Sequence, residues 1–346
     1  MDVSFEGAST KDEPRNAVAC PDFTFPNLDD KDYALYSLNE ESLANVELVL
    51  AGAIADPLLR MQTWNMLSQM VRDGQLAPLR YHALAVGGLR KEDDEGVLSI
   101  LLGRYSPLKD LYTDYLSPTD RGELAPAFEQ VVLDRLAAAE KGSTKQMLFF
   151  DFFTRLVQTP ANLEKIAGWL EKNDPPAGIT LDQERRWTAL ITLARNGFAR
   201  APALVDAEEK KDPSDLGKRS AYAARVALPT EEAKATFWKA LDHVEQIPPS
   251  TLRAAVAEFH QPNYLDLSKG YVKPYFDRLR TLDWKKSDSL VKVYFGGLFP
   301  GNLCSKEVLD QSRAALRGAK NLTDLARRSW LEANDELARC VRVGRR

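Results

Sequence analysis

The side chains that could do chemistry are few, and their spacing does not assemble a complete catalytic set. The chain has three histidines, His82, His243 and His260, and none has a histidine or an acidic partner four residues away, as in the HExxH zinc motif. His243 and Glu245 are two residues apart, which directs them to different faces of a helix. The GxSxG nucleophile elbow, the GxxxxGK phosphate loop and a strand–GxGxxG–helix unit are absent from the sequence. We therefore predict no catalytic residue and no metal ligand in this chain.

The cysteines give no signal for a metal or disulfide site. Cys20, Cys304 and Cys340 lie far apart along the chain, and their number is odd. They predict neither a disulfide framework nor a zinc knuckle, and this usage fits a reducing cytosol. The N-terminus has no basic segment followed by an apolar one, so no secretory signal is visible. We expect a cytoplasmic location.

Three arginines are the candidates for contact with a ligand. Arg60 stands four residues before Trp64, and Arg185 and Arg186 directly precede Trp187. Each guanidinium could stack on its tryptophan, pair with a carboxylate of a neighbouring helix, or face a cavity and bind a peptide carboxylate. Pairing with a carboxylate within the fold is the favoured interpretation, since most arginines of a helical array lie on the surface or pack against neighbouring helices. We keep Arg60, Arg185 and Arg186 as candidates for the wall of a peptide cavity.

The charge and hydropathy of the chain exclude several classes of partner. The sequence has 46 Lys and Arg residues against 50 Asp and Glu residues, a formal net charge of -4. Nucleic acids and anionic membranes both require a basic surface, so neither is an expected partner. The longest apolar run, from Leu48 to Ala55, is far too short to cross a bilayer.

From Leu38 onward the sequence predicts a succession of helices joined by short loops that carry proline or glycine. Roughly fifteen segments have apolar residues at helical spacing, and many are near the usual length of three turns. Strict sequence repeats are absent, which indicates a degenerate array. We predict an all-α fold over residues 38–346, an α/α superhelix of antiparallel helix pairs like an irregular HEAT or armadillo solenoid.

The stretch from Thr180 to Pro229 is the best-marked part of this array. Thr180 or Asp182 can cap its first helix, and Gly197 supplies the left-handed residue that ends it. The second helix of the stretch is expected to have Asp212 as its cap, with a proline in its first turn. Its buried side consists of small residues, which let a neighbouring helix approach closely.

Residues 1–37 differ from the rest of the chain. MDVSFEG alternates like a strand, and Phe23 and Phe25 flank Thr24 as in a second short strand. Two strands cannot bury a face alone. We predict that residues 1–37 are an extended segment, either the end of a preceding β-domain or a strap that lies on the helices, and we favour the first.

The helical part resembles a known family in several ordered stretches. The stretches are DPLLRMQTWNMLSQMVRDG, LDQERRWTALITLARNG, DLGKRSAYAARVALP, FHQPNYLDLSKGYVKPYFDRL and RRSWLEANDELARCVR. In order and spacing they resemble the C-terminal helical domain of the zinc-dependent (gluzincin) aminopeptidase N family, bacterial type. PDFTFPNLDDKDYALYSLNEESL resembles the entry to that domain, which makes residues 1–20 the expected tail of the family's small β-sandwich.

The resemblance implies a non-catalytic role. In this family the helical superhelix closes over the active site and lines an internal cavity for peptides, while a separate catalytic domain holds zinc through HExxH and a distant glutamate. The resemblance therefore implies no cofactor in this chain, zinc in the missing catalytic domain, and that domain and peptide substrates as partners. The alternative is a free-standing α-solenoid scaffold that binds a protein or peptide, and an enzyme with a novel site is the least favoured hypothesis.

Overall fold

The computed structural model describes residues 23–27, 34–106, 111–282, 284, 288–320 and 322–344 of the chain. Within these ranges the backbone is helical or irregular and contains no strand. The predicted all-α fold is therefore confirmed. No helix in the described ranges combines the length and apolar content needed to span a bilayer.

The helices follow one another closely along the chain. Three short elements interrupt the α-helices: the π-helical turn η2 (Val49–Ala53) and the 3-10 turns η3 (Leu241–Gln246) and η4 (Pro300–Leu303). The α-helices are α1 (Glu40–Leu48), α2 (Pro57–Arg72), α3 (Pro78–Lys91), α4 (Glu95–Gly103), α5 (Leu111–Tyr115), α6 (Pro118–Ala138), α7 (Thr144–Leu156), α8 (Pro160–Lys172), α9 (Gln183–Arg195), α10 (Ala201–Lys211), α11 (Asp215–Ala227), α12 (Glu231–Ala240), α13 (Pro249–Ala257), α14 (Leu265–Lys269), α15 (Val272–Leu279), α16 (Asp288–Gly296), α17 (Lys306–Gly318) and α18 (Asp324–Val343).

The ends of α9 follow one of the two predicted capping schemes. Asp182 is the N-cap, and its carboxylate accepts a hydrogen bond from the Arg185 amide at 2.9 Å. Thr180 does not cap the helix. Gly197 has φ +67° just beyond the helix, so the predicted left-handed end is confirmed.

The predicted cap of α11 is wrong. Ser214 is the N-cap, and its hydroxyl accepts from the Gly217 amide at 3.1 Å. Asp212 lies before the helix, where its carboxylate accepts from the indole nitrogen of Trp187 at 2.8 Å. A Cβ at Gly217 would lie only 2.1 Å from the Asp212 carbonyl oxygen, so this close turn requires glycine. The hydrogen bond from the buried Trp187 indole to Asp212 is a tertiary contact, and no local sequence pattern predicts it.

Small residues form the buried side of α11, as the sequence predicts. Ser220, Ala223, Ala224 and Ala227 are buried, and α11 packs between α9 and α13. Short side chains on the middle helix bring the three axes close together. This packing is typical of a stacked helical array.

Residues 265–279 form two short helices and not one continuous helix. α14 ends at Lys269 and α15 begins at Val272. Pro274 has no amide hydrogen to donate to the carbonyl of Gly270, and its ring would collide with that carbonyl in a continuous helix. The chain therefore turns between the two short helices.

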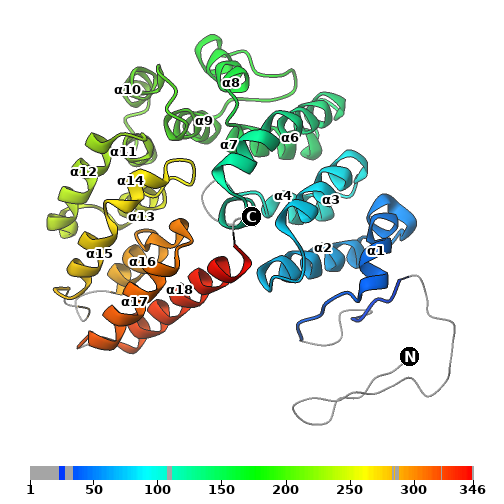
Figure 1. The fold of residues 1–346 in the computed structure, drawn as a ribbon. Coiled ribbons are helices and arrows are strands. Elements are labelled where there is room, and N and C mark those ends of the chain that lie inside the picture. The colour runs from blue at the N-terminus through cyan, green and yellow to red at the C-terminus, as the bar shows by residue number, and fades with distance from the viewer. Residues whose placement is uncertain are drawn as a thin grey trace.

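The array curves into a closed ring (Figure 1). Helices α1 to α7 run up one side, α8 to α10 lie at the top, and α11 to α17 descend the other side. The last helix, α18, then lies against α2 and α5, so the two ends of the array meet. We call the contact between α2 and α18 the seam. It contains the ion pairs Arg72–Glu336 and Arg339–Asp73, which join residues more than 260 positions apart.

The interior consists of two hydrophobic clusters. The first extends from Leu38 to Ala227, and the second extends from Val226 to Leu337. They meet where α11 packs on α13 and again at the seam, where Cys340 of α18 belongs to the first cluster. The ring is therefore stabilised by apolar packing at both junctions.

The described part of the N-terminal segment lies on α1. The Thr24 amide donates to the Ser42 hydroxyl at 2.9 Å, and Phe23 and Phe25 pack half-buried against the first cluster. Residues 23–25 form no strand, so the predicted second strand is wrong. MDVSFEG lies outside the described residues, and the origin of residues 1–37 in a β-sandwich stays a prediction.

Candidate functional site

A cavity of about 680 Å³ lies in the centre of the ring, and we call it the central cavity. Its walls come from α2, the end of α4, α5, α16 and α18, and the first three are adjacent to the last two because the ring closes. A smaller cavity of about 170 Å³, the side cavity, adjoins it and shares Asp114, Tyr115, Phe295 and Glu336 with it. The wall of the side cavity also includes residues of η4.

The central cavity carries charges of both signs. Its basic residues are Arg72, Arg104 and Lys292, and its acidic residues are Asp114, Glu332 and Glu336. Such a surface suits a ligand that is itself zwitterionic or rich in amide groups.

Two of the cavity cations have donors available for a ligand. The Arg104 guanidinium donates through Nη2 to the side-chain oxygen of Asn65 at 2.9 Å. Lys292 is exposed and forms no ion pair with another residue in the described part of the chain. Arg72, in contrast, is paired with Glu336 at the seam. Arg104 and Lys292 are therefore the cavity cations best placed to bind an incoming anion.

Tyr115 adds a neutral donor to both cavities. Burial raises the pKa of Tyr115 to about 12, against a smaller lowering effect of Arg72. Its hydroxyl group therefore stays protonated at physiological pH. A protonated phenol can donate a hydrogen bond to a carbonyl or a carboxylate oxygen.

Comparison with known proteins places this architecture in a family. The sequence model of the ERAP1-like C-terminal domain matches residues 23–339. The chain belongs to the ERAP1-like C-terminal domain family. A curated relative, the aminopeptidase N of Streptomyces lividans, is 32% identical over 343 residues. That match covers 99% of this chain and 39% of the relative, so the ERAP1-like domain described here spans well under half of that protein's length.

Arg60 of this ERAP1-like domain lies in a buried ion pair. Its guanidinium donates to both carboxylate oxygens of Glu92, at 2.8 and 2.9 Å, and to the carbonyl oxygens of Ile54 and Ala55. Burial by itself raises the pKa of Glu92. The bonds from Arg60 and from two backbone amides outweigh that effect, so the pKa of Glu92 lies below its ordinary value. Arg60 joins α2 to the end of α3.

Arg185 and Arg186 also lie in ion pairs between helices. Arg185 donates to both oxygens of Asp151 on α7, at 2.7 and 3.2 Å. Arg186 donates to both oxygens of Glu208 on α10, each at 2.7 Å. Neither arginine lines the central or the side cavity, and the same holds for Arg60. Contact of these three residues with a peptide stays a prediction.

Two histidines of the domain are buried, and one of them, His260, also lines the side cavity. Burial lowers the pKa of His82 to about 4, and its Nδ1 lies 3.2 Å from the Tyr105 hydroxyl. Burial also lowers the pKa of His260 to about 4, and its nitrogens contact Ser268 and the Leu298 carbonyl. Among the described residues no group of three His, Cys, Asp or Glu side chains gathers as a metal site.

A buried lysine is the most perturbed cation of the fold. Lys234 is 1% exposed, and its ammonium donates to the carbonyl oxygens of Val226 and Glu258. Burial lowers the pKa of Lys234 to about 7, partly opposed by the nearby Glu258 charge. It lies outside both cavities and links α12 to the junction of the two hydrophobic clusters.

The cysteines correct the sequence prediction. Cys304 and Cys340 form a disulfide, with their Cα atoms 5.5 Å apart and 36 positions between them in sequence. The prediction of unpaired cysteines failed because distance along the chain does not limit distance in the fold. Cys20 lies outside the described residues.

Sequence reasoning missed the charged groups of the central cavity. Arg104, Lys292 and Glu332 are single charges from three separate segments: the C-cap of α4, α16 and α18. Only ring closure brings them together. A local signal could not have identified them, because none of them forms a motif with its sequence neighbours.

Proposed function

We propose that this domain is the non-catalytic C-terminal part of a zinc-dependent aminopeptidase, in which it covers the active site and shapes the space for the peptide. Family membership and the aminopeptidase N relative support this proposal. Zinc and the groups that cleave the peptide bond would come from a separate catalytic part, which is the proposed partner. A cytoplasmic location, with neither membrane nor nucleic acid as partner, belongs to the same proposal.

The observation that carries the proposal is the charged cavity formed where the two ends of the helical ring meet. A ring placed over a catalytic cleft leaves room for an extended chain but not for a folded protein. The release of N-terminal residues from peptides needs this kind of size selection. The rigidity of the ring follows from its two apolar junctions and its paired seam.

The proposed ligand of the central cavity is the distal part of a peptide. Arg104 and Lys292 would bind peptide carboxylates, and Tyr115 would donate to backbone carbonyls. Glu332 would pair with basic side chains. This arrangement contacts a peptide far from the bond that is cleaved, so it favours longer substrates over single aminoacyl groups.

The test mixes this domain with the catalytic part of the aminopeptidase that it is proposed to complete. Binding is measured by sedimentation velocity, and activity is measured on peptides of increasing length and on an aminoacyl anilide. We expect a stable complex whose activity on longer peptides exceeds that of the catalytic part alone. If neither binding nor a gain in peptide cleavage occurs, the proposal is refuted, and a free-standing scaffold becomes the better hypothesis.

The double variant Arg104→Gln/Lys292→Gln tests the cavity. In the complex we expect KM for longer peptides to rise about tenfold, because charge-assisted hydrogen bonds are lost, while the anilide KM stays unchanged. The matched control is Arg200→Gln/Lys210→Gln, which removes the same two charges from the surface around α10, outside both cavities. An equal effect of the two double variants would exclude a specific role of the cavity.

A further inference from the structure

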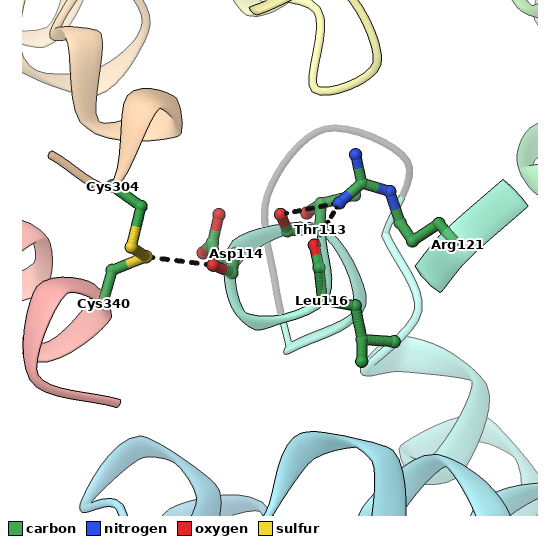
Figure 2. Close-up of a disulfide and its surroundings, with 6 residues drawn as sticks. All are labelled: Thr113, Asp114, Leu116, Arg121, Cys304 and Cys340. Carbon is green, nitrogen blue, oxygen red and sulfur yellow. Dashed lines mark hydrogen bonds between the residues drawn. A yellow bond between two sulfur atoms is a disulfide. The ribbon is translucent and has the colours of Figure 1, made fainter. Parts of the chain in front are cut away.

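The disulfide lies at the place where the ring closes (Figure 2). Cys304 directly follows η4, and Cys340 lies near the end of α18, one turn from Glu336 of the seam. Cys340 lines the side cavity, together with Gly301 and Asn302 of η4. The bond therefore joins one wall of the side cavity to the helix that forms another.

The backbone at Cys304 has an unusual conformation. Its φ is +48°, in the left-handed region that residues other than glycine rarely adopt. In the described part of the chain, Asn173 is the only other non-glycine residue in this region. Such outliers persist where the surroundings hold them in place. At Cys304 the covalent bond to α18 is such a restraint.

The sulfur of Cys340 also lies close to a backbone carbonyl of α5. Sγ of Cys340 lies 3.0 Å from the carbonyl oxygen of Asp114 in α5, as Figure 2 shows. A disulfide sulfur has no hydrogen to donate, whereas a thiol at this position can donate to that carbonyl. The two redox states of Cys340 therefore make different bonds: a covalent bond to η4, or a hydrogen bond to α5.

We propose that Cys304 and Cys340 form a redox latch, in which the disulfide fixes η4 to α18 and reduction releases the η4 wall of the side cavity while α18 stays at the seam. The ion pairs Arg72–Glu336 and Arg339–Asp73 hold α18 independently of the disulfide. In the reduced state the Cys340 thiol would add its bond to α5. Release of Cys304 would let its backbone return to an ordinary conformation.

The chemistry is thiol–disulfide exchange with a dithiol reductant. A thiolate of the dithiol attacks Sγ of Cys304, which is half-buried and more accessible than Cys340, and Cys340 leaves and is protonated. The second thiol of the reductant then attacks the mixed disulfide, forms its own disulfide, and releases Cys304 as a thiol. The protein gains two electrons and two protons, and the dithiol loses them. A disulfide such as oxidised glutathione reverses the exchange.

The latch does not depend on the proposed aminopeptidase role, because this chain alone contains every group involved. In a reducing cytosol the thiol state would be the resting state, and oxidation would fix the wall. Disulfides of cytosolic proteins are usually transient or redox-sensing.

The test measures amide hydrogen exchange of the intact chain in a Cys20→Ser background, in oxidised glutathione and in dithiothreitol. Mass spectrometry of proteolytic peptides establishes the state of the Cys304–Cys340 bond in each sample. On reduction we expect exchange of the η4 amides up to Cys304 to accelerate at least about tenfold, with α18 and α9 unchanged. The variant Cys304→Ser/Cys340→Ser should exchange at the fast rate in both buffers.

Three results would overturn the latch. The first is the absence of the disulfide in oxidised glutathione. The second is unchanged exchange in η4 after verified reduction. The third is accelerated exchange across the whole chain, including α9, because the bond would then be a general stabiliser of the fold and not a local latch.

Discussion

Replacement of Arg60 by Met should destabilise the fold without changing the cavity. Methionine keeps much of the length of the side chain and removes its charge and its donors. The change leaves Glu92 buried without its guanidinium and leaves two carbonyl groups, those of Ile54 and Ala55, without the donor they have in the native chain. Both side chains of the pair are 10% exposed or less, so water cannot replace the lost bonds.

The expected loss in the free energy of unfolding is about 4 kcal/mol. Removal of one partner from a buried ion pair costs about 3–5 kcal/mol. The unfolding entropy of a chain of 346 residues is roughly 0.7 kcal/mol per kelvin, taken from about 2 cal/mol per kelvin for each residue. The melting temperature should therefore fall by about 5–6 °C.

The loss in stability caused by Arg60→Met should become smaller as the pH is lowered. The pKa of Glu92 is lower in the fold than in the unfolded chain, so the pair stabilises the fold above the ordinary glutamate pKa. That contribution disappears as the pH falls through the lowered pKa of Glu92 in the folded chain. The difference between the native chain and Arg60→Met should therefore be largest near neutrality and shrink below about pH 4.

Calorimetry of the native chain and three variants measures the effect. The double variant Arg60→Met/Glu92→Leu should recover about half of the loss, since it leaves no unpaired buried charge. The control Arg200→Met breaks exposed ion pairs with Glu164 and Glu171 and should lower the melting temperature far less than Arg60→Met does. If Arg60→Met melts no lower than Arg200→Met, the structural role assigned to Arg60 is refuted. A loss of peptide affinity without a loss of stability would instead place Arg60 at a ligand.

Two further predictions concern the buried lysine and a tight helix contact. Lys234 has a folded pKa of about 7, below the unfolded value, so the unfolded chain binds more protons above pH 7 and stability should rise with pH. Relative to Lys234→Met, the native chain should gain about 2 kcal/mol between pH 7 and pH 9 in denaturant titrations, and an unchanged difference would contradict a neutral buried amine. Gly88→Ala should cost about 1–3 kcal/mol, because the new Cβ would lie 2.7 Å from the Trp64 ring. Gly87→Ala, with no atom within 4 Å of its new Cβ, should stabilise by up to about 1 kcal/mol, and equal melting temperatures for the two variants would refute the contact.

The sequence was sufficient for the class of fold and for many of its helices. Apolar spacing and caps narrowed the start of α9 to Thr180 or Asp182 and identified its end at Gly197, because helix ends depend on bonds between close neighbours in sequence. The small buried side of α11 was also predictable, since it needs only helical periodicity. Errors in the elements arose where tertiary contacts compete with local ones, as at Asp212, which bonds to Trp187 and leaves the cap to Ser214.

The candidate site was not predictable in the same way. Arg104 and Lys292 are almost two hundred positions apart, and they face one cavity only because α18 returns to α2. The sequence contains no signal for that return, because the seam consists of ordinary surface-type residues. The pairing of Cys304 with Cys340 was missed because separation along the chain does not limit distance in the fold.

Because α18 returns to α2, the number of helix pairs and the rotation from each pair to the next must together complete one full circle. An open solenoid accepts an additional repeat anywhere, because each repeat contacts only its neighbours. In this chain an inserted repeat would move Glu336 away from Arg72 and break the contact that closes the ring. Evolutionary changes in length are therefore expected in outward-projecting loops, while the count of helix pairs stays constant.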